Sequence, residues 1–467
     1  MKSNPPLFFF ILLIHLSAHS WVNPENTSSS LIKIEQELFE STLNKKNITA
    51  KGYLSDNKVR NILKDYKSLI PKNFKITPYY RERVHFWFKI YTQFDSDQVV
   101  IHDKENFDLI YNVIDFKRLK SGKKSNPFIK SKTQTKLSED YTRHLKKSLN
   151  LFAYKTKKLS KEDKSLLKKI KALFKIPKNK KKRKKFFRKL AKNIRTQTGQ
   201  RDMIQKGIVR SIPYFPYLEK KMSYFKLPKE LLAIPFLESS FNPLAYSKVS
   251  AAGAWQFMPF IASLFMPKRI PYKDYRLNIF VSSISAFHLL RENKQILKRW
   301  DLAVTAYNSG TKHLLKARKK LRKRKVAFTL RNVLDSYDNR HIGFASKNFY
   351  SEFIALVYVL DYKNEIYSIE NYKKEQRRFK TKSINFYITK CTINPQTIIN
   401  KLKRSSPNFK FLNSQFRRKN RSYKRGEILV SDVKLTSKRY TKVSDRVLIK
   451  YKPKFWEKYS RVGKCNR

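Results

Sequence analysis

The segment from Leu227 to Pro259 constrains this chain most, because it places one carboxylate on the apolar face of a predicted helix. It reads LPKELLAIPFLESSFNPLAYSKVSAAGAWQFMP. Pro228 suits the first position of a helix, and Leu231, Ile234 and Glu238 follow at spacings of three and four residues. A carboxyl group that is partly removed from water on such a face has a raised pKa, which a general acid needs.

The residues after Glu238 strengthen this interpretation. Ser239 and Asn242 are short polar side chains of the kind that end helices and can orient a carboxylate. Gly253 is one of only nine glycines in 467 residues, so we expect it to meet a backbone need, either a positive φ or close approach to a ligand. The alternative is that Glu238 only caps its helix or pairs with a nearby cation.

Three ordered motifs extend the pattern beyond this segment. ESSFNP begins at Glu238, SAAGAWQFMP at Ser250 and AYNSG at Ala306. Together they resemble the successive motifs of the lytic transglycosylase domain, a lysozyme-like α fold. Trp255 before Gln256 is similar to the membrane-bound lytic murein transglycosylase D type. The resemblance covers roughly residues 200–362.

The resemblance implies a chemistry and a set of site residues. In that family one glutamate, here Glu238, acts as acid and then as base on the MurNAc–GlcNAc β-1,4 bond of peptidoglycan. The N-acetyl group of the substrate assists, and the muramyl 6-hydroxyl attacks to leave a 1,6-anhydro end. The substrate-binding positions that it implies are Ser239, Gly253, Gln256, Met258, Tyr307 and Asn308.

Two rival functions remain open from the sequence. A hydrolytic muramidase of the lysozyme type would share the fold but yield reducing muramic acid ends. A catalytically inactive protein that binds envelope glycans would keep the fold without using Glu238. The chain has no HExxH, GxSxG, GxGxxG or P-loop motif and no clustered Cys/His set, so the sequence predicts neither a metal site nor a cofactor.

The N-terminus predicts export. Lys2 is followed by an apolar run and by Ala18-His19-Ser20, which is typical of a signal peptide over residues 1–20. No cysteine stands directly after the apolar run, where lipid would be attached, so a lipoprotein route is not expected. We therefore expect a periplasmic or cell-envelope protein, with membrane association as an alternative, in which Cys391 and Cys465 could pair.

The charge is extreme: 104 Lys and Arg against 35 Asp and Glu give a formal net charge of +69. Such a charge favours anionic polymers and membrane surfaces in general. Because the chain carries an export signal, we expect an anionic cell-envelope surface as its partner and no nucleic acid.

The sequence predicts a mainly α protein in several parts. A helical leader over 21–199 includes aromatic runs at 84–94 and 107–116 and a basic run at 175–192, interpreted as a solvated helix face. The lysozyme-like catalytic domain covers 200–365. Within it, Asn278 is expected to N-cap a helix that ends near Leu297.

The last third of the chain predicts a small α+β module and a tail. Residues 366–435 show a β-α-α-β order that resembles a LysM-like glycan-binding module, with Asn394, Gln396 and Asn413 placed to line a groove. The alternative is a cap that packs permanently on the catalytic domain. Residues 436–467 are expected to form a basic tail.

Overall fold

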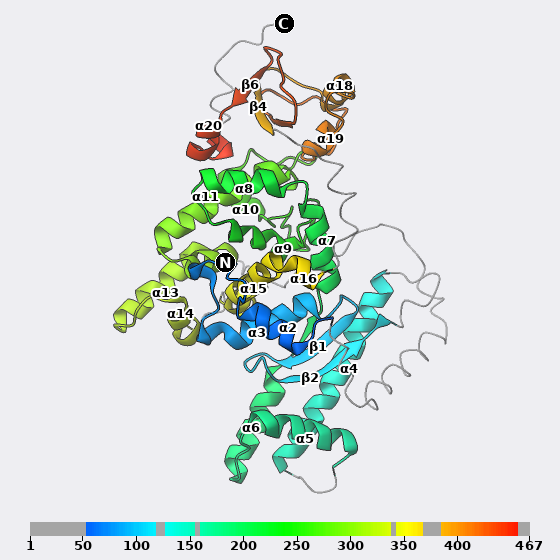
Figure 1. Cartoon of the computed structure of the whole chain (residues 1–467), viewed down its shortest axis with the longest axis vertical. Coiled ribbons are helices and arrows are strands. Elements are labelled where there is room, and N and C mark those ends of the chain that lie inside the picture. The colour runs from blue at the N-terminus through cyan, green and yellow to red at the C-terminus, as the bar shows by residue number, and fades with distance from the viewer. Residues whose placement is uncertain (1–52, 118–126, 155–158, 338–341, 368–383, 456–467) are drawn as a thin grey trace, which may run out of the picture. The chain divides into compact units, whose positions relative to one another are not determined.

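The computed structural model describes residues 53–117, 127–154, 159–337, 342–367 and 384–455 (Figure 1). These residues belong to two compact units. The leader unit contains residues up to Met203 together with Asp361–Ile366, and the motif unit contains Ile204–Leu360 and the chain from Tyr367 onward. The predicted signal peptide, Cys465 and part of the predicted basic tail lie outside the described residues.

The leader unit contains a sheet that the sequence analysis did not predict. Strands β1 (Gln98–Asp103), β2 (Ile110–Asp115) and β3 (Ile194–Thr198) pair antiparallel in the order β2-β1-β3. The helix predicted for the aromatic run at 107–116 is therefore wrong. Phe107, Tyr111 and Phe116 do lie in the core, as predicted, but they reach it from a strand and its flanks. Aromatic side chains suit strands as well as helices, so their spacing over so short a run does not decide between the two.

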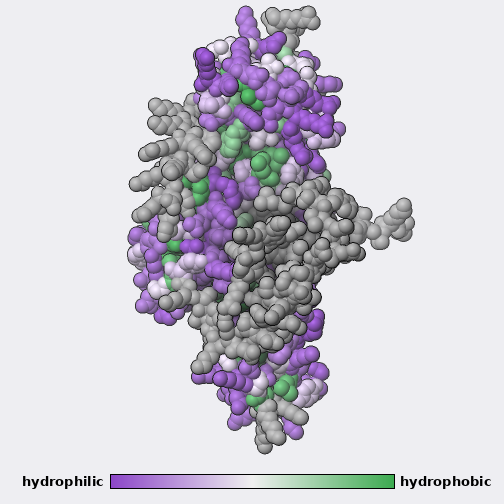
Figure 2. Space-filling model, turned by 90° about the vertical axis from the view of Figure 1, so that its right-hand side faces the viewer, coloured by the Kyte–Doolittle hydropathy of each residue, from purple (hydrophilic) through white to green (hydrophobic). Residues whose placement is uncertain are grey.

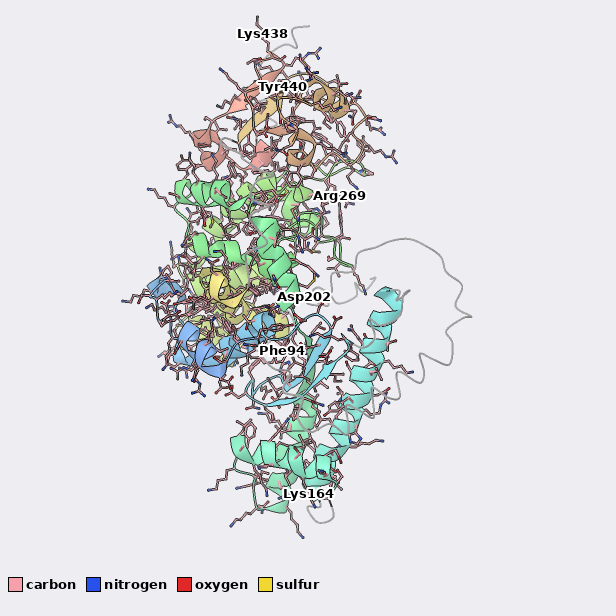
Figure 3. All side chains as sticks on the ribbon, turned by 45° about the vertical axis from the view of Figure 1, so that its right-hand side comes forward. Phe94, Lys164, Asp202, Arg269, Lys438 and Tyr440 are labelled. Atoms are coloured by element: carbon pink, nitrogen blue, oxygen red, sulfur yellow. The ribbon has the colours of Figure 1, made fainter. Side chains whose placement is uncertain are left out.

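Helices cover the rest of the leader unit. They are α2 (Asp56–Leu63), α3 (Arg81–Thr92), α4 (Pro127–Tyr154), α5 (Lys161–Leu173), α6 (Lys180–Asn193) and the short α16 (Lys363–Ile366). Helix α6 confirms the interpretation of the basic run: Phe187 and Leu190 face the core, whereas most of its lysines are exposed. Phe94, which follows α3, and Asp202, which follows β3, lie close together (Figure 3), and the Phe94 carbonyl accepts a hydrogen bond from the Arg201 amide at 2.9 Å.

The motif unit is built from helices around α11. Its helices are α7 (Arg201–Ser211, which begins in the leader unit), α8 (Phe215–Tyr224), α9 (Ile234–Ser239), α10 (Pro259–Phe265), α11 (Ile279–Leu297), α12 (Trp300–Ser309), α13 (Thr311–Lys323), α14 (Leu330–Ser336) and α15 (Phe344–Asp361). Helix α11 contacts α8, α10 and α12. The Asn278 side chain accepts hydrogen bonds from the Phe280 and Val281 amides at 3.0 and 3.1 Å, so the predicted N-cap is confirmed.

The end of the chain, residues 384–455, forms what we call the terminal section. It contains β4 (Asn385–Thr389), α18 (Pro395–Lys401), α19 (Phe409–Leu412), β5 (Ile428–Ser431), β6 (Tyr440–Val443) and α20 (Asp445–Lys450). The first four follow the β-α-α-β order expected from the sequence, and the strands pair in the order β5-β4-β6. Figure 2 shows its described surface, at the top of the view, as mostly hydrophilic. The resemblance to LysM modules stays a prediction.

Two expectations for this section differ from the structure. The segment expected to be a basic tail contains strand β6 and helix α20. It is ordered there because β6 pairs with β4 as the third strand of the sheet. Asn413 was expected to line a glycan groove but is 2% exposed, and its side chain bonds the Val430 backbone at both ends. The side-chain amide of Asn413 therefore holds the end of α19 against β5.

The terminal section packs directly on the helices of the motif unit. Lys273 and Glu427 form an ion pair of 2.6 Å in which both side chains are less than a tenth exposed. The Asn278 amide donates to the Leu412 carbonyl at 2.8 Å, and the Tyr214 and Phe411 rings stack at 5.7 Å. These buried polar and aromatic contacts favour the second interpretation of this section, a cap on the helical domain.

Candidate active site

Glu238 lies in the last turn of a short helix that the sequence analysis drew too long. The predicted continuous helix is a 3₁₀ segment, Lys229–Ala233, followed by the six-residue helix α9. Pro235 is the physical reason, because it has no amide proton to donate back into the preceding turn. Helix α9 begins with Pro235 in its first turn and ends one residue after Glu238.

The end of α9 turns sharply and is held by α7. Ser240 and Phe241 both have positive φ, 49° and 56°, which is uncommon for residues other than glycine. The Ser240 carbonyl accepts a hydrogen bond from the Arg210 guanidinium at 2.5 Å. A Cβ on Gly207 would come within 2.6 Å of the same carbonyl, so only glycine lets α7 approach so closely. The sequence analysis missed Gly207 and Arg210; the scarcity of glycine was the available signal.

The Glu238 carboxyl is partly buried, and no other side chain is found to hydrogen-bond it in the described residues. Burial raises its pKa from 4.5 to about 8. Within the described residues this carboxyl makes no hydrogen bond or ion pair that would stabilise its charged form. Glu238 therefore carries a proton at neutral pH, and the alternative that it caps a helix or pairs with a cation does not fit its surroundings.

Residues 244–257 form a loop, which we call the motif loop, beside the end of α9. Gly253 has φ +80°, and a Cβ there would lie 1.8 Å from the Arg276 carbonyl oxygen. The backbone need predicted for Gly253 is thus confirmed, although the close neighbour is protein rather than ligand. The Ser239 hydroxyl donates to the Ala254 carbonyl at 2.9 Å and ties this loop to α9. The sugar contact predicted for Ser239 stays a prediction.

Gln256 presents an unused acceptor near the C-terminal end of the motif loop. Its φ is +46°, and its side-chain amide donates to the Gly253 carbonyl at 2.7 Å. Its Oε1 atom is buried and has no hydrogen-bond partner in the described structure. A buried acceptor left without a partner costs free energy, so a ligand N–H that bonds it would stabilise a complex.

Tyr307 lies close enough to Glu238 for their charges to interact, but it bonds elsewhere. Burial and then the Glu238 charge raise the pKa of Tyr307 well above its ordinary value. Its hydroxyl donates to the Trp255 carbonyl at 2.7 Å, so it fixes the motif loop rather than the carboxyl of Glu238. Asn308, the next residue, accepts a hydrogen bond from the Ser346 hydroxyl at 2.7 Å. Met258 is half-buried and immediately precedes α10.

Comparison with known proteins covers this part of the chain. Residues 216–327 match the family described as "Transglycosylase SLT domain". These residues form an SLT domain. The SLT domain thus holds all the site residues described above from Glu238 to Asn308 and most of the helices packed around α11.

Curated relatives match a short stretch of this chain. "Membrane-bound lytic murein transglycosylase D" of Escherichia coli strain K12 is 34% identical over 110 residues, 23% of this chain and 24% of that protein. A "Putative tributyltin chloride resistance protein" of Alteromonas sp. strain M-1 is 34% identical over 109 residues, 53% of its length. The match thus spans about a quarter of the first relative and about half of the second.

The next acid along the SLT domain is committed to an ion pair. Asp274 accepts hydrogen bonds from the Arg276 guanidinium at 2.7 and 3.0 Å, and both side chains are 2% exposed. Arg276 also donates to the Ser250 and Phe257 carbonyls at 2.6 and 2.9 Å. The sequence analysis missed this pair, which clamps the motif loop. No group of three or more His, Cys, Asp or Glu side chains that could hold a metal occurs in the described ranges.

Proposed function

We propose that this chain is an exported lytic transglycosylase that cleaves the MurNAc–GlcNAc β-1,4 bond of peptidoglycan with Glu238 as the single acid/base. The carboxyl of Glu238 carries this proposal, because burial raises its pKa to about 8 and keeps the proton available at neutral pH. Its position in an SLT domain supports the substrate class.

The motifs ESSFNP, SAAGAWQFMP and AYNSG contain no carboxylate besides Glu238, which favours an internal nucleophile. Two-carboxylate glycosidases use one group as acid and the other as nucleophile or base. Here Asp274 is neutralised by Arg276, so Glu238 serves twice. Its proton goes to the glycosidic oxygen as the C1–O bond breaks, with the substrate N-acetyl group stabilising the anomeric carbon. The muramyl 6-hydroxyl then bonds that carbon and returns its proton to Glu238, so no water is consumed and a 1,6-anhydro end forms.

The neighbouring residues have separate parts in this proposal. The free Oε1 atom of Gln256 accepts the N–H of an N-acetyl group of the substrate. Met258 and Asn308 are half-exposed and contact the sugar rings. Tyr307 and Gly253 keep the motif loop in the conformation that leaves Glu238 half-buried.

The location of the protein is part of the proposal. The signal-like N-terminus and the relative named as membrane-bound support export to the periplasm or cell envelope. In the parts of the chain that are described, no helix is both long and apolar enough to cross a membrane. The cationic surface supports association with the anionic cell envelope, and glycan binding by the terminal section is proposed on its β-α-α-β order.

The proposal is tested by replacing the acid without changing its shape. Glu238→Gln should lower the release of soluble fragments from peptidoglycan by two or more orders of magnitude, the usual effect of losing a general acid. The matched control is Glu230→Gln, the same change at the other carboxylate of residues 227–259. Its release of soluble fragments should stay within about tenfold of wild type. Wild-type release by the Glu238→Gln protein would show that another group performs the reaction.

A further inference from the structure

Residues 272–278 connect the terminal section to the motif loop. Lys273 and Asp274 are followed by a 3₁₀ turn, Tyr275–Leu277, and the side chains of this stretch contact two different parts of the structure. Lys273 and Tyr275 contact Glu427 of the terminal section, whereas Asp274 and Arg276 contact the motif loop. We call residues 272–278 the connecting segment.

On the first side, Glu427 makes two short, buried contacts. Its Oε1 atom accepts from the Lys273 ammonium at 2.6 Å, and its Oε2 atom accepts from the Tyr275 hydroxyl at 2.6 Å. The same hydroxyl accepts from the Ile428 amide at 2.8 Å. Glu427, Lys273 and Tyr275 are 6%, 7% and 1% exposed. Charge-assisted bonds in so dry a place hold their partners in one geometry.

The backbone joins the same two parts. Lys273 and Phe416 form an isolated antiparallel β-bridge. The Asp274 amide donates to the Gln415 carbonyl at 3.0 Å, and the Arg417 amide donates to the Tyr272 carbonyl at 2.9 Å. Backbone hydrogen bonds thus attach the start of the connecting segment to residues 415–417 of the terminal section.

On the other side, Arg276 fixes the middle and the C-terminal end of the motif loop. It bonds the carbonyls of Ser250 and Phe257, and its own carbonyl lies against Gly253. The loop in turn presents the free Oε1 atom of Gln256 and is tied to the end of α9 by Ser239. An unbroken series of bonded groups therefore runs from Glu427 to the residue beside Glu238.

We propose that Glu427 is a positioning residue of the active site: through Lys273 and Tyr275 it holds the connecting segment, which sets the conformation of the motif loop beside Glu238. The terminal section is then a working part of the active site and not only a cover for the helices. This inference rests on the proposed function, because the loop matters only if Glu238 and Gln256 act on a substrate.

The test removes the charge of Glu427 and follows the motif loop directly. Glu427→Gln leaves the Lys273 ammonium buried without a counter-charge, which weakens the attachment of the connecting segment. Hydrogen exchange at the amides of residues 244–257, measured well below the unfolding temperature, should be at least tenfold faster than in wild type. The matched control is Asp445→Asn, which breaks the Lys221–Asp445 ion pair that joins the terminal section to α8. It should leave exchange in the loop unchanged.

A second variant guards against misfolding of the first. Tyr275→Phe removes one hydroxyl, keeps the Lys273–Glu427 ion pair and should also speed exchange in the motif loop. In both variants water gains access to Glu238, so its raised pKa should fall. The alkaline limb of kcat/KM should then shift to lower pH by about one unit or more, with Tyr307 the nearest titrating neighbour.

The outcomes separate this inference from the proposed function. Faster loop exchange in Glu427→Gln and Tyr275→Phe but not in Asp445→Asn supports the positioning role, even if the wild-type protein does not cut peptidoglycan. Unchanged loop exchange in the first two variants, or equally fast exchange in all three, overturns it. Activity lost in step with the unfolding temperature, with no shift in the pH profile, also overturns it.

Discussion

At the scale of single residues, Glu238 combines two properties that oppose each other in an ordinary surface glutamate. It is close enough to solvent to meet a substrate, yet burial raises its pKa to about 8. The short helix α9 produces this combination, because it ends at the residue after Glu238 and two residues of positive φ turn the chain away.

This raised pKa makes stability depend on pH in a defined direction. Below about pH 4.5 Glu238 is protonated in both the folded and the unfolded chain, so its contribution to stability is fully present. As pH rises to about 8 only the folded chain keeps the proton, and the free energy of unfolding falls. Glu238→Gln has no carboxyl to titrate and lacks this loss. Its free energy of unfolding should therefore exceed that of wild type by about 2 kcal/mol or more at the alkaline end of the range.

Urea unfolding at the two ends of this range measures the difference. The two proteins should have similar stability at the acidic end and diverge as pH rises. Parallel stability curves for wild type and Glu238→Gln across the range would show that burial does not hold the proton on Glu238.

The sequence was sufficient to place Glu238 near the end of a helix and to predict a backbone need at Gly253, because each depends on local pattern. It could not identify Arg276 as the clamp of the motif loop or Gln256 as a buried acceptor. The burial of the Gln256 acceptor depends on how the motif loop folds. Arg276 bonds carbonyls 26 and 19 residues away, and nothing in the spacing of charges shows which carbonyl a guanidinium will reach. The same holds for Glu427, which lies 154 residues from its partner Lys273.

At the scale of elements, the motif loop depends on one crowded glycine. Gly253→Ala adds a methyl group that would lie 1.8 Å from the Arg276 carbonyl oxygen at a φ of +80°. We expect a loss of stability of about 3 kcal/mol or more, together with loss of activity, because the loop must open. Gly310→Ala is the control: its φ is +81°, but its nearest neighbour is a His313 ring atom 3.8 Å away.

The control separates crowding from backbone strain. Gly310 has φ +81° and ψ +137°, so Gly310→Ala should cost only the roughly 1–3 kcal/mol of backbone strain that is usual for a sparsely populated conformation, without the clash. Thermal unfolding of both variants gives the comparison. Equal losses of stability at the two glycines would mean that the close approach of the Arg276 carbonyl to Gly253 does not affect stability.

Prediction of the elements from sequence succeeded where periodicity was long. Helix α11 follows its predicted N-cap and runs to Leu297, and the β-α-α-β order of the terminal section is found. It failed where runs were short: Pro235 breaks the predicted catalytic helix, and the run at 107–116 contains a strand. Tertiary pairing with β1 decides the second case, and no single-sequence pattern contains that pairing.

At the scale of the whole molecule, positive charge is spread over both units. Helix α6 exposes lysines along one side, and residues 311–334, which include α13, contain no Asp or Glu. The surface should therefore bind anionic envelope polymers without a specific pocket. The sequence already showed this charge. It did not show that the terminal section belongs to the same compact unit as the SLT domain.

Binding to whole sacculi should weaken steeply with salt, whereas cleavage of a short soluble glycan should change little. The measurements should cover the salt concentrations over which the Debye length falls from about 10 to about 3 Å. Exposed cations at a distance are screened over this range, but contacts within a half-buried site are not. Equal salt sensitivity of binding and cleavage would place the cationic surface in the active site itself.

The central claim concerns the product, and mass spectrometry of peptidoglycan digested by the purified wild-type protein tests it most directly. If the muramyl 6-hydroxyl attacks the anomeric carbon, the new ends are 1,6-anhydro-MurNAc, lighter by one water than hydrolytic products and unreactive to borohydride. Reducing MurNAc ends would contradict the account and identify a hydrolytic muramidase on the same fold.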